Sequence, residues 1–188
     1  EKISNDKLSL ELILLIFPEL KHLKIFSKLS LHQKSLLEET NFIFLLSLMI
    51  IDETDNVDYF LYKYNISKKD QKRIKVIDNF FKNKINNKTF SEKKMNKVLY
   101  YEGRQAVIDI LKFRMIRSRK FDKNLIELSN FFKDKIAPIM PVKADMLMTK
   151  YKIPEGKQLG LKLRIIEEEW VENDFKISDQ QIEEIIKN

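Results

Sequence analysis

Glycine and proline are scarce in this chain and concentrated in one stretch. Five of the seven such residues lie close together, and the only tryptophan follows them. Because these residue types interrupt regular backbone most strongly, the rest of the chain can form long helices or strands. The clustered residues are Pro138, Pro141, Pro154, Gly156 and Gly160, and the tryptophan is Trp170.

Inside this stretch the pattern predicts a helix, a tight corner and a second helix. Apolar residues have helical spacing over 144–152, and Ile153-Pro154-Glu155-Gly156 is a turn signal. The second helix runs on through Trp170. Gly160 inside it costs about 1 kcal/mol relative to alanine, which suggests that another backbone approaches closely there.

Helical spacing continues along almost the whole chain, and no strand-like alternation is sustained. We predict an all-α fold, with an irregular helical body over residues 1–120 and a small helical tail over residues 121–188. Capping residues support several starts, among them Ser67, Ser91 and Ser178. Outside the corner, the predicted helices span residues 6–16, 20–29, 31–39, 41–51, 57–64, 68–84, 93–117 (which Gly103 can interrupt), 123–135 and 179–188.

Several kinds of site are excluded or disfavoured by composition. The chain has no cysteine, so it holds neither a disulfide nor a thiolate metal site, and it has only His22 and His32. Its longest apolar run, residues 42–51, is about half of what a membrane-spanning helix needs. The polar start does not resemble a signal peptide. We expect a cytoplasmic protein without a membrane partner, and the absence of an initial methionine suggests a piece of a longer chain.

Positive charge is concentrated in one block. Residues 61–120 carry 18 basic and 5 acidic side chains, within a chain of net charge +7. Such a block favours a polyanionic partner, whereas the simpler interpretation is a coat of solvated lysines. Arginine is more informative, because four of the six arginines lie between residues 104 and 119 and guanidinium groups match phosphate oxygens. These four are Arg104, Arg114, Arg117 and Arg119.

The tail resembles the C-terminal region of bacterial class II tRNA nucleotidyltransferases and poly(A) polymerases. That family's tail has a proline before the first helix, an aspartate a few residues later, two glycines around the corner, and a Glu-x-x-Trp motif. A weaker match is Leu61-Tyr62-Lys63-Tyr64-Asn65-Ile66-Ser67 in the body. Two family glycines are absent, with Ala144 at one position and Tyr151 or Lys152 at the other. The matching tail residues are Pro141, Asp145, Met146, Ile153, Gly156, Leu159, Gly160, Leu163, Glu167 and Trp170.

The resemblance implies that catalysis and RNA binding lie in different parts of a longer enzyme. The family's catalytic head, which uses Mg²⁺ and ATP or CTP, would lie upstream, and this chain would hold the phosphate backbone of RNA, first of all tRNA. We therefore expect no cofactor, no metal and no catalytic residue in this chain. The expected RNA-binding residues are Arg104, Lys112, Arg114, Arg117, Arg119, Lys120, Lys143, Lys150 and Lys157.

The residues themselves also argue against catalysis. The chain has no Asp-x-Asp pair for a metal-dependent nucleotidyl transfer, and neither histidine lies in a motif. We interpret residues 52–58 as a solvated acidic loop and residues 167–169 as the solvated side of a helix. Trp170 is expected to anchor the tail core. Tyr100 and Tyr101 are better candidates for stacking on bases, although helix packing is the simpler role.

Two other functions fit the same residues. The corner at Gly156 could be a helix-hairpin-helix-like phosphate site of a nonspecific DNA-binding module, because a glycine turn before a helix presents free N–H groups. Alternatively, the chain could be a purely structural interaction domain. A preference for tRNA over duplex DNA would separate the RNA-binding function from the DNA-binding module.

Overall fold

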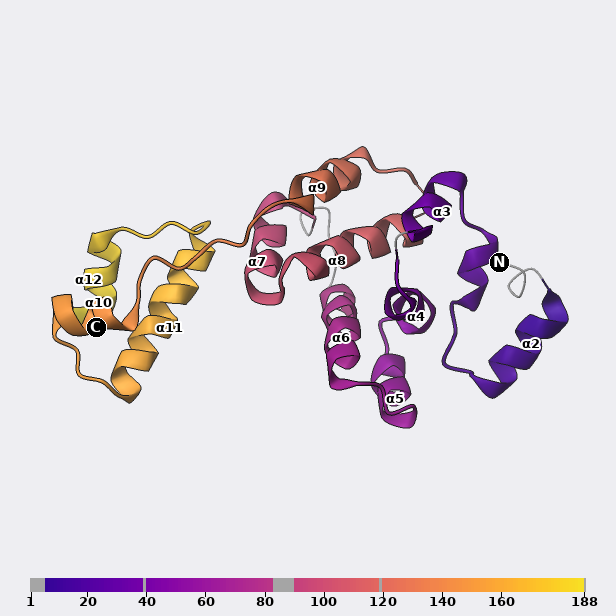
Figure 1. The fold of residues 1–188 in the computed structure, drawn as a ribbon, viewed down its shortest axis with the longest axis horizontal. Coiled ribbons are helices and arrows are strands. Elements are labelled where there is room, and N and C mark those ends of the chain that lie inside the picture. Colours follow the sequence, from indigo (N-terminus) through magenta and orange to yellow (C-terminus); the bar gives the residue numbers. More distant parts are fainter. Residues whose placement is uncertain (1–5, 39, 83–89, 119, 188) are drawn as a thin grey trace. The chain divides into compact units, whose positions relative to one another are not determined.

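The computed structural model describes residues 6–38, 40–82, 90–118 and 120–187, and over this part the chain is all-α, as predicted, with no strand. It divides into two compact units, residues 1–135 and residues 136–188 (Figure 1). The helices of the first unit are α2 (Lys7–Ile16), a 3₁₀ turn η1 (Leu23–Ser27), α3 (Leu31–Glu38), α4 (Phe42–Ile50), α5 (Asn56–Lys63), α6 (Lys68–Lys82), α7 (Glu92–Glu102), α8 (Arg104–Arg117) and α9 (Lys123–Lys133). Those of the second unit are α10 (Ala144–Tyr151), α11 (Lys157–Glu172) and α12 (Asp179–Lys187).

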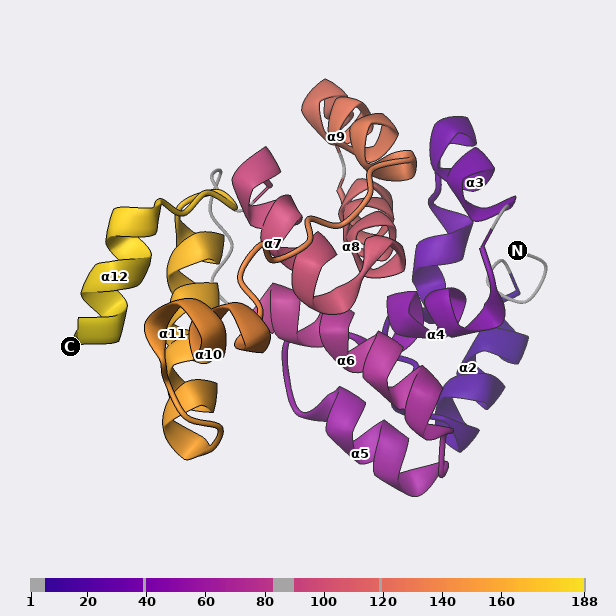
Figure 2. The ribbon, with the colours of Figure 1, turned by 60° about the vertical axis from the view of Figure 1, so that its left-hand side comes forward.

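Helix α8 is the centre of the first unit. It packs against α3, α4, α6, α7 and α9, and both ribbon views show these helices around it (Figures 1 and 2). Its side chains Val107, Ile110 and Leu111 are fully buried. A helix with apolar residues on most of its circumference can pack on several sides at once, which explains its central position.

The sequence boundary between body and tail differs from the division in the structure. From the sequence we expect this boundary near residue 120, whereas the first unit extends to Lys135. The reason is α9, which packs along α8 and buries Leu125 and Phe132. Helix α9 therefore belongs to the first unit.

Two glycines mark the corners that the sequence indicates. Gly103 separates α7 from α8 with φ of 85°, and Gly156 precedes α11 with φ of 145°. Both angles lie where a side chain is strained, so glycine suits these turns. The long pattern over 93–117 is thus two helices.

Side-chain caps define other helix ends. Ser91 accepts a hydrogen bond from the Lys94 N–H at the start of α7. At α12, the Ser178 N–H donates to Gln181 Oε1 at 2.9 Å, and the Gln181 N–H donates to Ser178 Oγ at 3.3 Å. This reciprocal capping box satisfies two N–H groups that a helix start leaves without partners.

The second unit has a small core of its own. Helix α11 packs against both α10 and α12. Their buried contacts come from Val142, Leu147, Leu159, Ile166 and Ile182. Apolar packing between three short helices thus holds the unit around its Gly156 corner.

Candidate nucleic-acid interface

Most of the predicted RNA-binding cations are exposed and have no acidic partner. Arg104, Arg114 and Lys120 are exposed in the first unit, where Lys112 is half-buried, and Lys143 and Lys157 are exposed in the second. None of these six forms an ion pair with another residue that the structure describes. Their charges are therefore available to a ligand in solution.

The acids of the basic block are already engaged. Asp109 binds Arg73, Asp78 binds Lys82 at 2.9 Å, and Glu92 binds Lys135 at 3.0 Å. Glu102 binds Lys72 at 3.5 Å, and Asp70 accepts a hydrogen bond from the Ser67 hydroxyl. The five acidic side chains of residues 61–120 thus all have partners within the first unit.

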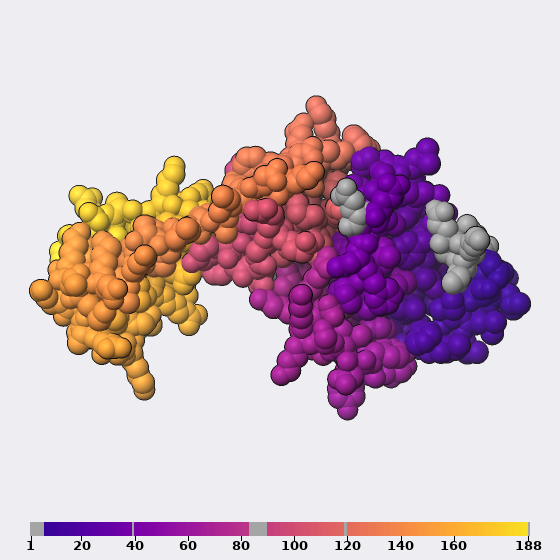
Figure 3. All heavy atoms as spheres, in the orientation of Figure 1, coloured from indigo at the N-terminus to yellow at the C-terminus, as the bar shows by residue number. Residues whose placement is uncertain are grey.

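A polar groove lies between α6 and the first half of α8. Arg73 Nε and Nη2 donate to the two carboxylate oxygens of Asp109 at 2.7 and 2.9 Å, and Gln105 Nε2 donates to Asp109 Oδ1 at 2.9 Å. Lys69, Lys72 and Lys112 line the adjoining pockets of about 340 and 120 Å³. Side chains from the magenta segment that contains α5 and α6 stand out from the surface of the first unit (Figure 3). The groove combines the fixed Arg73 guanidinium with these lysines, and the carboxylates of Asp70, Glu102 and Asp109 also line its pockets.

The cations of α8 lie on two sides of the helix. Lys112 and Arg114 are two residues apart, which is about 200° around an α-helix. Lys112 lies on the side of the α6 groove, and Arg104 lies about 80° around the helix axis from both Lys112 and Arg114. Arg114 lies on the other side, where its guanidinium stacks over the Phe90 ring at 5.5 Å from the ring centroid. The predicted set therefore forms separate groups around α8.

The structure contradicts the predicted role of Arg117 as an RNA contact. Its guanidinium is turned into the first unit, where Nη2 donates to the carbonyl oxygens of Leu48 and Ile51. It also lies over the Phe113 ring at 5.0 Å from the centroid. Burial lowers the pKa of this guanidinium. Arg117 is therefore a structural residue that caps the end of α4, since the last carbonyls of a helix lack partners within it.

Two other predicted residues fall outside the set of free cations. Lys150 forms an ion pair with Asp179 at 3.6 Å and lies over the Tyr151 ring. The nearby Tyr151 hydroxyl and the charge of Asp179 raise the pKa of Lys150. Arg119 lies outside the residues that the structure describes.

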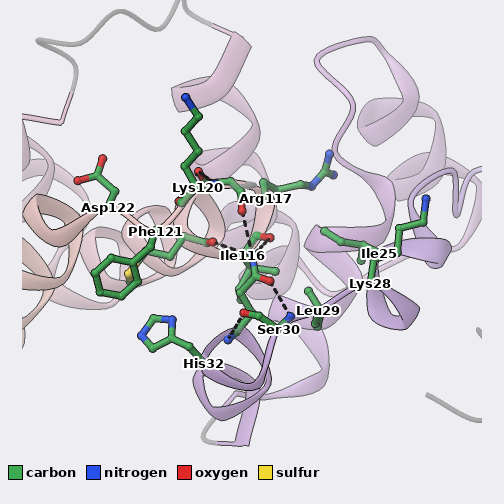
Figure 4. A pocket seen from close by; sticks show the side chains of 13 residues that line it. Ile25, Lys28, Leu29, Ser30, His32, Ile116, Arg117, Lys120, Phe121 and Asp122 are labelled. Atoms are coloured by element: carbon green, nitrogen blue, oxygen red, sulfur yellow. Dashed lines mark hydrogen bonds between the residues drawn. The ribbon is translucent and has the colours of Figure 1, made fainter.

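A second pocket lies at the end of α8. It has a volume of about 450 Å³ and is formed by η1, α3 and residues 115–118 and 120–122 (Figure 4). The rings of His32 and Phe121 meet edge to face at 5.5 Å, and Lys28 lies at the opposite end of the pocket. Lys120, a predicted RNA-binding residue, also lines this pocket and is exposed. The pocket thus joins exposed aromatic rings and cations.

In the second unit the corner before α11 leaves its first residues accessible. Gly156, Lys157 and the three residues before them are exposed or half-buried. Gly160, however, is exposed, and a Cβ built on it meets no atom within 4 Å. The prediction that another backbone approaches Gly160 is therefore wrong for the structure described.

The aromatic residues and the histidine noted in the sequence analysis make contacts within the protein. Trp170 is buried, and its ring meets the Phe175 ring edge to face at 5.0 Å between centroids. Tyr100 and Tyr101 contact each other edge to face, and Tyr101 is about half exposed. His22 is half-buried, and burial, followed by the charge of Arg117, lowers its pKa.

The acidic loop after α4 is engaged in ion pairs and turns. Asp52 binds Lys21 at 2.6 Å, and Asp58 binds Lys75 at 2.9 Å. Across the described ranges no three His, Asp or Glu side chains are grouped so that they could hold a metal ion. Nor does any described helix combine the length and apolar character required to cross a membrane.

Comparison with models of known protein families, with curated proteins and with solved structures finds no match for this chain. Its function is therefore inferred from its own residues and geometry.

Sequence reasoning missed several residues of these surfaces. Lys69 and Lys72 belong to the basic block, but they lie outside the arginine cluster on which the predicted contacts are based. Lys28 precedes the block. Phe121 is an aromatic residue in a predicted connector, beside the predicted cation Lys120. An exposed aromatic residue next to a basic one in a connector is the signal that could have identified the second pocket.

Proposed function

We propose that this chain binds RNA through the phosphate backbone, with tRNA as the first candidate ligand. The observation that carries the proposal is the set of six predicted cations without an acidic partner among the described residues. Phosphate contacts of this kind supply affinity without reading sequence. The contacts in the first unit are Arg104, Lys112, Arg114 and Lys120, and those in the second are Lys143 and Lys157.

The groove between α6 and α8 supports this function in the first unit. Arg73 is fixed by Asp109, so it contributes a structural pair and part of the groove wall. The surrounding lysines can follow a flexible backbone because ammonium groups bind phosphate as point charges. An elongated RNA backbone fits several separate contacts better than a small anion does.

We further propose that the chain acts as the helical body and tail of an enzyme similar to tRNA nucleotidyltransferases or poly(A) polymerases. The all-α architecture and the helix–Gly156–helix corner agree with that likeness. In this proposal the chemistry at the RNA 3′ end, with Mg²⁺ and ATP or CTP, belongs to a head outside this sequence. Its location would be cytoplasmic.

A competition experiment tests the proposal. A fluorescent tRNA transcript is bound to the chain and displaced with unlabelled tRNA or with duplex DNA of equal phosphate content. We expect tRNA to compete at lower concentration. A triple variant, Arg104→Ala, Lys112→Ala and Arg114→Ala, should lose about 10-fold or more in affinity.

The matched control removes the same charge from cations that are already paired. Lys7, Lys123 and Arg164 each form an ion pair with a glutamate one helical turn further along. Their simultaneous replacement by alanine should change tRNA affinity much less than the test variant does. Stronger competition by duplex DNA, lost in Lys157→Ala, would instead support the DNA-binding module. Equal affinities in all variants would support a structural interaction domain.

A further inference from the structure

The pocket at the end of α8 is formed before any ligand binds. Gln33 on α3 donates through Nε2 to the carbonyl oxygens of Met115, Ile116 and Ser118 at 3.2, 3.0 and 3.0 Å. The Ser30 N–H in turn donates to Gln33 Oε1 at 2.9 Å. One side chain thus joins two segments more than eighty residues apart and satisfies carbonyls at the end of α8.

Apolar atoms form the interior wall of this pocket and aromatic rings form one end. Ile25, Leu29 and Ile116 contribute to the wall. Phe121 is 72 % exposed although it is a large apolar side chain, and it is held against the ring of His32. A flat aromatic ligand can bury that exposed ring surface by stacking, which lowers the free energy of both partners.

The charge around the pocket selects an anionic ligand. Lys28 and Lys120 are both exposed, and neither has an ion-pair partner in the part of the chain that the structure describes. Among the described residues that line the pocket, Asp122 is the one acid, and its Oδ1 accepts a hydrogen bond from the Asn124 N–H at 3.0 Å. The cations therefore outnumber the acids at the rim.

We propose that this pocket binds an unpaired nucleotide of RNA. The base stacks on Phe121 beside His32, and Lys28 and Lys120 bind the flanking phosphates. A volume of about 450 Å³ lies in the range of about 300–1,000 Å³ typical of small-ligand sites. This inference rests on the proposed RNA-binding function and adds single-stranded RNA as the ligand of one defined site.

The hydrogen bonds already present also predict how selective the site is. The amide of Gln33 is committed to backbone carbonyls, and Ser118 Oγ donates to the Lys120 carbonyl. With these polar groups engaged, stacking and charge dominate recognition. Such contacts tolerate every base, since each base has an aromatic face.

Fluorescence of a single-stranded RNA hexamer that contains 2-aminopurine tests the site, because this base is quenched when it stacks. A blunt RNA duplex, which has no unpaired nucleotide, measures backbone binding separately. Phe121→Ala should weaken binding of the hexamer about 5- to 100-fold and remove the quenching, while duplex affinity changes less than about twofold. Phe121→Trp should retain the quenching, and Lys28→Glu should weaken hexamer binding without affecting the Phe121 environment.

Tyr62→Ala is the matched control, because Tyr62 is 89 % exposed and does not line the pocket. Its hexamer affinity should equal that of the unaltered chain. The pocket is ruled out as a nucleotide site if the duplex binds but the hexamer is not quenched, or if Tyr62→Ala and Phe121→Ala have equal effects. If neither RNA binds the unaltered chain, the proposed function itself fails and this site fails with it.

Discussion

The guanidinium of Arg117 donates a hydrogen bond to the carbonyl oxygen of Leu48 at 2.9 Å, across 69 residues of sequence. It belongs to a set of contacts from neighbouring segments that complete the end of α4. The His22 N–H donates to the Met49 carbonyl at 3.0 Å, and Asn56 Nδ2 donates to the Ile50 carbonyl at 2.7 Å. Arg117 also donates to the carbonyl of Ile51, so four successive carbonyls have partners from three segments.

This geometry predicts opposite behaviour for two neighbouring arginines. Arg117→Ala should lower the free energy of unfolding by about 2 kcal/mol, because it leaves part-buried carbonyls without a donor. The affinity of the folded protein for tRNA should be unchanged. Arg114→Ala should show the reverse, with nearly unchanged unfolding and weaker tRNA binding.

Denaturant unfolding and tRNA titration of the two variants make the comparison. An Arg117→Ala variant that folds normally but loses tRNA affinity would contradict the structural role of Arg117.

We expect the stability of the first unit to depend strongly on the Asp109 carboxylate, which binds Arg73. Asp109 is 2 % exposed and receives three hydrogen bonds. Asp109→Ala should cost about 3 kcal/mol, because the guanidinium then loses its partner in a part-buried site. Lys123→Ala, which breaks the exposed pair with Glu127, should cost at most about 0.5 kcal/mol. Urea unfolding curves measure the stability of both variants. Equal unfolding midpoints would refute the larger cost expected for Asp109→Ala.

The two glycines of the tail should respond to alanine with opposite signs. Gly156 has φ of 145°, so Gly156→Ala should destabilise the chain by about 1 kcal/mol or more. Gly160 lies inside α11 with open space around it, so Gly160→Ala should stabilise it by about 0.5–1 kcal/mol. Thermal unfolding monitored by circular dichroism distinguishes them. Destabilisation by Gly160→Ala would mean that another backbone does approach that position.

Acid should weaken the contact between Glu19 and Lys63. Burial of the Glu19 carboxyl raises its pKa, but hydrogen bonds from Lys63 at 2.8 Å, its own N–H and the Tyr64 hydroxyl outweigh burial, and the net pKa is lowered. A lowered pKa in the folded state stabilises the fold above the unfolded value of about 4.3, and this stabilisation is lost as the pH falls further.

Glu19→Gln should therefore lose less stability than the unaltered chain between about pH 5 and pH 2, because it has no carboxylate to protonate. Unfolding free energies at several pH values test this, with Glu11→Gln on the exposed face of α2 as the control. If the unfolding free energies of Glu19→Gln and of the unaltered chain fall equally with pH, Glu19 contributes nothing to the pH dependence of stability.

Local chemistry explains what could be predicted from the sequence. Ser91 and the Ser178–Gln181 box define helix starts through contacts within three residues, so their effect is visible in a short window. Gly103 and Gly156 likewise mark corners through their own backbone angles. The all-α class follows from apolar spacing alone.

Contacts between distant segments explain what could not be predicted. Arg117 and Arg114 share a helix and a charge, but only the position of α4 directs one inward and leaves the other in solvent. The boundary after residue 135 depends on α9 packing along α8, which its periodicity does not specify. The pocket beside Phe121 needs Gln33, more than eighty residues away from the carbonyls it binds.

The dependence of tRNA affinity on salt concentration tests the central proposal most directly. If unpaired cations bind phosphates, the logarithm of the association constant falls linearly with the logarithm of salt concentration, by about 0.7–0.9 for each contact. The triple variant of Arg104, Lys112 and Arg114 should reduce that slope by about 2 to 3. Affinity that does not change with salt in the unaltered chain, or equal slopes in both proteins, would show that these cations do not bind phosphates.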